Sequence, residues 1–243
     1  LAMSLAGLLI AYARPGRMGK IAGVFLLFTP IFPVMLYWAW TESFVLLMLA
    51  VVWFCHKRLP RFLPYAVGLF LVSKQYMILI APLTILLLPR PWNARQIVSF
   101  AWRACLAGTI VTLPLVLWDR EAFLKSAVFL QFHQPFRWDA MSFLVLARPH
   151  NPSQWVWLPF LMVAAALVGI LWTGLRRTVS FPLAMGMTLL LFFAFNKQAF
   201  ANYYYLVTGA LCCALADETV NMQFRKGAGI PHENMPQGDK RSF

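Results

Sequence analysis

Long apolar runs separated by short basic clusters are the feature of this sequence that most restricts its fold. Residues 97–118 form one such run, and residues 155–173, which end shortly before Arg176, form another. Runs of this length can cross about 30 Å of hydrocarbon as α-helices. No regular alternation of apolar and polar residues recurs along the chain, although a membrane barrel would need it. The sequence therefore predicts an all-α, polytopic bundle of transmembrane helices.

The composition supports a membrane protein and argues against other classes. With 61% hydrophobic residues, 12% charged residues and a mean hydropathy of +0.68, the chain is too apolar for an ordinary water-soluble domain. The formal net charge of +13 does not indicate nucleic-acid binding, because Lys and Arg form short groups between apolar runs. The 4 cysteines and 4 histidines lack metal-ligand spacing, so we expect no metal ion.

Residues 1–216 are expected to form the bundle, with about eight to nine membrane segments, some of them short and interrupted. Because Leu1 lies inside an apolar run, we expect the chain to be truncated at its N-terminus. Residues 119–153 are predicted to form an outer loop that contains a helix on the membrane surface. From residue 217 onward Gly, Pro and charged residues replace the apolar runs, which predicts a disordered cytoplasmic tail over residues 217–243.

Residues 62–88 can be interpreted either as one long tilted helix or as two short helices that meet at Lys74 and Gln75. The choice reverses the orientation of everything that follows. With two short helices forming a hairpin, most of the 21 Lys and Arg residues fall on one side of the membrane, whereas one long helix divides them almost equally. Since positive residues concentrate on the cytoplasmic side, the charge distribution favours the hairpin. Lys74, Arg137 and Lys197 then share the outer face with Glu42.

Two polar interruptions of apolar runs indicate a site. Asn196, Lys197 and Gln198 break the apolar residues 189–206, with Asn202, Tyr203 and Tyr204 close behind. Lys74 and Gln75 break residues 69–76 in a similar way. A lysine at bilayer depth costs about 2.5 to 3.5 kcal/mol, so it needs an anionic or polar partner. We interpret Lys197 as a phosphate ligand. The alternative is that residues 196–198 form a loop at the membrane surface, with the tyrosines in the interfacial aromatic belt.

Several short motifs together resemble bacterial multi-pass GT-C type glycosyltransferases, and among these the mannosyltransferase-like proteins of glycosyltransferase family 87. The motifs are Trp40-Thr41-Glu42, the 68–76 run ending in Lys-Gln-Tyr, residues 134–137 with 139–142, and residues 195–198 with 202–204. The resemblance covers most of residues 40–215. It implies an enzyme of the bacterial inner (plasma) membrane that passes a sugar from a polyprenyl-phosphate donor to a lipid or glycan acceptor at the outer face. It implies no metal or nucleotide.

A lipid phosphate is the leaving group of such a reaction, so cations and amide donors at the membrane boundary would stabilise its charge. Lys74, Arg137 and Lys197 fit this role as cations. The side chains that could bind phosphate oxygens or sugar hydroxyls, or stack on a sugar ring, are Gln75, Asn196, Gln198, Asn202, Tyr203 and Tyr204.

The acceptor hydroxyl also needs a base, and Glu42 is the best placed of the predicted outer carboxylates. Its alternative interpretation is a solvated turn residue, while Asp139 can pair with Arg137 or cap a helix. A family member would carry its base in a first outer loop that this sequence lacks, so we expect donor binding without transfer. A transporter or lipid flippase is the rival function, because interrupted helices with an internal lysine also describe a substrate path. A structural membrane subunit is the third possibility.

Overall fold

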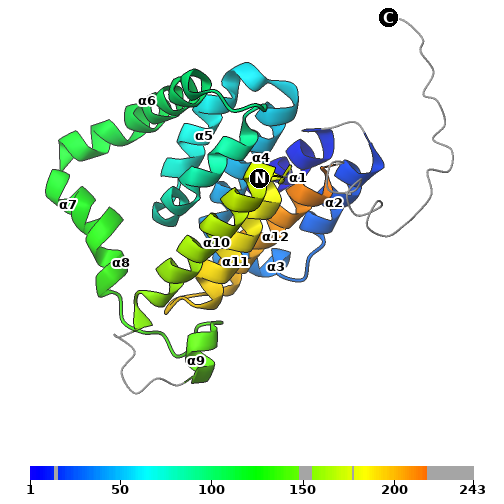
Figure 1. The fold of residues 1–243 in the computed structure, drawn as a ribbon. Helices are drawn as coiled ribbons and strands as arrows, with labels where there is room; N and C mark the ends of the chain where they lie inside the picture. The colour runs from blue at the N-terminus through cyan, green and yellow to red at the C-terminus, as the bar shows by residue number, and fades with distance from the viewer. Residues whose placement is uncertain (14–15, 148–154, 177, 218–243) are drawn as a thin grey trace, which may run out of the picture.

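The computed structural model describes residues 1–13, 16–147, 155–176 and 178–217, and this part of the chain is helical, with no strand (Figure 1). The predicted tail, apart from Asp217, and the end of the predicted outer loop lie outside these residues. The α-helices are α1 (Ala2–Ala13), α2 (Arg17–Leu27), α3 (Phe32–Trp38), α4 (Glu42–Arg58), α5 (Leu63–Val72), α6 (Ala94–Trp118), α7 (Arg120–Leu124), α8 (Leu130–His133), α9 (Phe143–Ala147), α10 (Leu158–Arg176), α11 (Phe181–Ala194) and α12 (Ala201–Leu215). Three further helical segments are η1 (Pro60–Phe62), η2 (Gln75–Leu87) and the π-helical η3 (Lys125–Phe129).

The all-α prediction is confirmed for the described residues, whereas the predicted eight to nine membrane segments are not confirmed. Two helices, α6 and α10, are long and apolar enough to cross a membrane. The pair α2 and α3 passes the same criteria as one span bent by 52°, at a break that contains Pro30. Proline removes a backbone donor and clashes with the preceding turn, which explains why α2 and α3 are two short helices and not one long one. The larger number of membrane segments stays a prediction.

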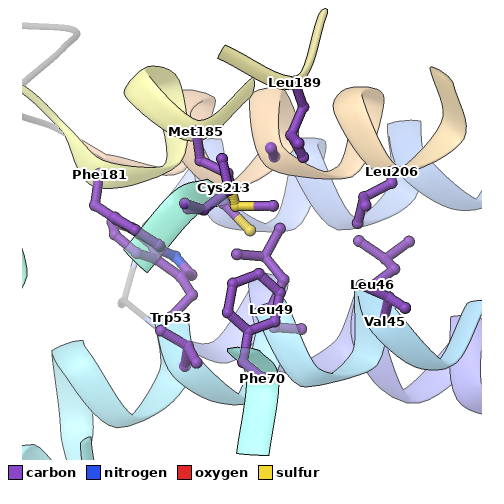
Figure 2. Close-up of a cluster of buried hydrophobic side chains, with 14 of the residues drawn as sticks. Val45, Leu46, Leu49, Trp53, Phe70, Phe181, Met185, Leu189, Leu206 and Cys213 are labelled. Carbon is purple, nitrogen blue, oxygen red and sulfur yellow. The ribbon is translucent and has the colours of Figure 1, made fainter. Parts of the chain in front are cut away.

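The core lies between α4, α5, α11 and α12. Figure 2 shows Leu49 and Trp53 of α4 facing Met185 of α11 and Cys213 of α12, with Phe70 of α5 beneath them. All five side chains are buried. Such interdigitated side chains fix the helices relative to one another, and with them the residues at the helix ends.

The chain reverses direction between α5 and η2, as the hairpin interpretation requires. Gly68 of α5 packs against Ala104 of α6, and further along both helices Val72 lies at Gly108, so α5 and α6 run parallel. Because the two helices run parallel, the start of α6 lies beside the start of α5. Only a short connection joins η2 to α6, so the end of η2 must also lie near the start of α5. The alternative of one long helix over residues 62–88 is therefore wrong, and the favoured interpretation of two short helices is confirmed.

The bundle has two chemically different ends. At the first, which we call the site end, Tyr76 at the start of η2 contacts Phe193 near the end of α11 at a ring-centroid distance of 5.3 Å. At the second, which we call the basic end, Arg58 donates to the Tyr12 carbonyl at 3.4 Å. Arg90 likewise donates to the Gly174 carbonyl there.

The outer surface of the bundle is apolar. Trp102, Ile110, Leu117 and other large side chains of α6 are exposed, as are Leu161 and Val168 of α10. Contiguous apolar surface of this kind is typical of a helix that faces lipid. In Figure 1, α6, α7 and α8 form an arm beside the bundle. The helix predicted inside residues 119–153 is thus present as α7, η3 and α8.

Candidate functional site

Glu42 and Lys74 form an ion pair at the site end. Glu42 is the first residue of α4, and Lys74 lies in extended backbone between α5 and η2. The Lys74 ammonium donates to the Glu42 carboxylate and to the Thr41 hydroxyl, the latter at 2.8 Å. Because the Glu42 side chain is 1% exposed, its interpretation as a solvated turn residue is wrong. A carboxylate buried this deeply needs a cation or several donors, and Lys74 supplies the cation.

Aromatic rings surround this ion pair and join the two predicted polar interruptions. The Lys74 ammonium lies 5.9 Å from the centre of the Tyr76 ring and 5.7 Å from that of Tyr203. The two tyrosine rings meet edge to face at 5.7 Å, and Phe193 stacks on Tyr203 at 4.8 Å. Tyr203 follows the interruption at residues 196–198, and Lys74 belongs to the interruption at residues 74–75. Residues far apart in sequence therefore form one site. Aromatic faces within about 6 Å also stabilise the ammonium charge.

Lys197 and Gln198 hold the segment after α8 against the bundle. The Lys197 ammonium donates to the carbonyls of Phe132 and Gln134 at 3.0 and 2.6 Å, and the Gln198 amide donates to the Pro135 carbonyl at 3.0 Å. Partial burial lowers the pKa of Lys197. These side chains therefore already have partners in the protein, unlike the free phosphate ligands that the sequence predicted.

Asn196 and Tyr204 also make internal contacts. The Asn196 side-chain oxygen accepts from the Gln198 backbone amide at 3.1 Å, which fixes the turn between α11 and α12. The Tyr204 hydroxyl donates to the Met141 carbonyl, tying α12 to the segment before α9. Both residues thus position the site end.

Arg137 lies beside this turn. Its backbone amide donates to the Lys197 carbonyl at 3.2 Å, and its guanidinium lies 5.2 Å from the Phe200 ring. The guanidinium donates twice to the Asp139 carboxylate, at 2.8 Å each, which lowers the pKa of Asp139 to about 2. The predicted pairing of Asp139 with Arg137 is confirmed. Both side chains are exposed, so a ligand can reach the pair from solvent or from the membrane boundary.

Gln75 and Asn202 differ in accessibility. Gln75 is exposed next to Lys74, so its amide can meet a ligand. Asn202 is 7% exposed, and its side-chain oxygen has no hydrogen-bond partner among the described residues. A buried acceptor without a donor is costly, and such atoms in native proteins call for an explanation.

Thr41 and Tyr76 also contribute to the site, although the sequence analysis quoted them only within motifs and gave them no role. Each lies one or two residues from a predicted site residue, so proximity in sequence to Glu42 and Lys74 was the signal that could have identified them. The described residues contain no cluster of His, Cys, Asp or Glu that could hold a metal ion. Chemically, the site offers a partly exposed lysine, an exposed amide, an exposed arginine and tyrosine faces.

Comparison of the chain with protein-family models, with curated proteins and with solved structures finds no match.

Proposed function

We propose that this chain is an integral membrane glycosyltransferase that moves a mannose-like sugar from a polyprenyl-phosphate donor to a lipid or glycan acceptor. The observation that carries the proposal is the meeting of the two polar interruptions around the Glu42 and Lys74 pair, with Tyr76 and Tyr203 beside the ammonium. A lysine held at the edge of an apolar bundle suits a lipid phosphate, and tyrosine faces suit a sugar ring.

The proposal places about eight to nine membrane segments in the inner membrane of a bacterium. It places the site end at the outer face and the basic end in the cytoplasm. Exposed apolar surfaces of α6 and α10 support the membrane location. Arg58 ends α4, Arg95 lies in the first turn of α6, and Arg176 ends α10. These helix ends lie at the basic end, where Arg90 contacts Gly174, and this concentration of positive charge supports the orientation.

Lys74 is proposed to bind the donor phosphate, with Gln75 and Arg137 as the neighbouring donors. Both are exposed, and Lys74 retains 21% side-chain exposure while it contacts Glu42. Glu42 is proposed to hold Lys74 in place. For Glu42 to act as the base, the acceptor would have to reach a carboxylate that is almost completely buried. Lys197 and Gln198 are proposed to shape the site from behind, since their donors are already bound to carbonyls.

Donor binding by a charge-neutral double variant tests the proposal. Glu42→Gln with Lys74→Met removes the cation without leaving a buried carboxylate unpaired, so the fold is retained. We expect binding of radiolabelled polyprenyl-phosphate mannose by the purified full-length protein to fall by at least tenfold, and transfer to an acceptor lipid extract to be lost. Lys125→Met, which removes an exposed cation from η3, is the control and should leave both unchanged. Unchanged donor binding by the double variant would refute the role of Lys74.

A transporter or lipid flippase is the second candidate. The observation that favours it is the interrupted pair α5 and η2, because broken helices with polar centres line substrate paths in transporters. Reconstitution in liposomes with a fluorescent polyprenyl-phosphate in one leaflet separates the two functions. Movement of the probe between leaflets without sugar transfer would favour the transporter, whereas sugar transfer with a static probe is expected from the enzyme.

A further inference from the structure

The outward face of α2 contains a groove that the proposed site does not use. Its lining residues are Arg17, Lys20, Ile21, Val24, Phe25 and Phe28. They lie on one helix face, because their spacing of three and four residues follows the helical repeat. The groove is shallow and wide open to the surroundings, with a volume of about 440 Å³. It begins at the basic end, far along the bundle from Lys74.

The two ends of this groove differ in chemistry. Arg17 and Lys20 are exposed at the start of α2, and neither makes an ion pair or a side-chain hydrogen bond to any residue that the structure describes. Beyond them the groove is apolar, with Val24 56% exposed, Phe25 58% and Phe28 81%. A ligand that matches it needs an anionic group joined to a long apolar chain.

The length of α2 agrees with such a ligand. At 1.5 Å per residue, α2 is about 16 Å long, close to half of the roughly 30 Å hydrocarbon core of a bilayer. With its basic start at the membrane boundary, the groove therefore reaches from the boundary through most of one leaflet. A phospholipid has the same dimensions, with a phosphate at the boundary and acyl chains within the leaflet.

We propose that the α2 face binds one anionic glycerophospholipid of the leaflet at the basic end. Arg17 and Lys20 hold its phosphate, and an acyl chain lies along Val24, Phe25 and Phe28. A second helix could cover an apolar face equally well, but it would leave two adjacent cations without a counter-charge. Because neither cation is paired with a residue that the structure describes, the charge of this face favours a lipid, and an anionic lipid over a zwitterionic one.

Lipid titration of the purified full-length chain tests this site. The protein in neutral detergent is titrated with phosphatidylglycerol or phosphatidylcholine, and bound lipid is measured by native mass spectrometry. The wild-type chain should bind phosphatidylglycerol more tightly. Arg17→Gln with Lys20→Gln should weaken that binding by about 30-fold, since each charge near a membrane surface contributes about a factor of five.

Two further variants make the result specific. Arg120→Gln with Lys125→Gln removes two exposed cations from the arm and should leave lipid binding unchanged, whereas Phe25→Asn should weaken binding of both lipids. A thermal transition like that of the wild type shows that each variant is folded. Equal affinity for the two lipids, or an equal loss in the Arg120 and Lys125 variant, would overturn the proposal. The proposal would also be overturned if inorganic phosphate displaced the lipid. It would equally be overturned if the chain bound no lipid and instead formed a dimer that Phe25→Asn abolished.

Discussion

Glu42 and Lys74 depend on each other because each neutralises a charge that the bundle would otherwise bury. Taking a carboxylate out of water costs several kcal/mol, and an ammonium contact offsets much of that cost. The Thr41 hydroxyl and the Tyr76 and Tyr203 rings further restrict the lysine. The position of the ammonium is therefore set before any ligand arrives, which reduces the entropy lost on binding.

Removal of the lysine alone should destabilise the protein strongly. Lys74→Met leaves the Glu42 carboxylate buried without a cation, and we expect the free energy of unfolding to fall by about 3 to 5 kcal/mol. Chemical denaturation of the purified protein in detergent measures this loss. Adding Glu42→Gln should restore a large part of it. If the double variant were no more stable than Lys74→Met, the ion pair would not be the cause.

The pair formed by Arg137 and Asp139 should titrate in acid. The carboxyl pKa of Asp139 is lowered from 3.8 to about 2 by hydrogen bonds from Arg137, so the stabilisation from this contact is complete above pH 3.8 and is lost as the pH falls through about 2. Carbon NMR of the labelled Asp139 carboxyl group measures the midpoint. In Arg137→Gln we expect the midpoint to move back toward 3.8. A midpoint that does not move would show that Arg137 does not hold this carboxylate.

At the scale of helices, the contact between α5 and α6 depends on a missing side chain. A Cβ atom on Gly68 would overlap the Ala104 carbonyl of α6, so the helix backbones touch at this position. Val72 reaches Gly108 in the same interface, and a Cβ there would come within 2.9 Å of the valine. This close packing aligns α5 so that its end presents Lys74 to Glu42.

A glycine-to-alanine pair tests the interface. Gly68→Ala should lower the free energy of unfolding by about 1 to 3 kcal/mol, because the added methyl group forces two backbones apart. Gly169→Ala, in α10, meets no atom within 4 Å and should instead stabilise the helix by about 0.5 to 1 kcal/mol. Thermal unfolding of both variants in one detergent provides the comparison. Equal effects of the two substitutions would contradict close packing at Gly68.

At the scale of the whole molecule, the proposed orientation can be measured by labelling. On a background in which the exposed Cys105 is replaced by serine, cysteine introduced at position 137 should react with a membrane-impermeant maleimide in intact cells. Cysteine at position 95 should be protected until the membrane is opened. The physical reason is the concentration of Lys and Arg at the basic end, which favours the cytoplasm. The reverse pattern would place the site end inside the cell.

Much of the fold was predictable from the sequence. The apolar runs predicted helices, and the charge distribution predicted that the chain reverses at Lys74, because both depend on which residues the surroundings can solvate. Glu42 and Lys74 were predicted site residues on one face. Their direct contact, and the burial of Glu42, could not be predicted, since they depend on how α4, α5 and η2 pack.

The same division between sequence and tertiary structure applies to the polar interruption at residues 196–198. The sequence by itself determined that Lys197 could not remain without a polar partner in apolar surroundings. Only the tertiary structure decided that the partners within the protein are the Phe132 and Gln134 carbonyls and not the side chain of a distant acid. Helix formation and charge placement follow from local composition, whereas hydrogen-bond partners many residues away depend on which helix ends the packed core brings together.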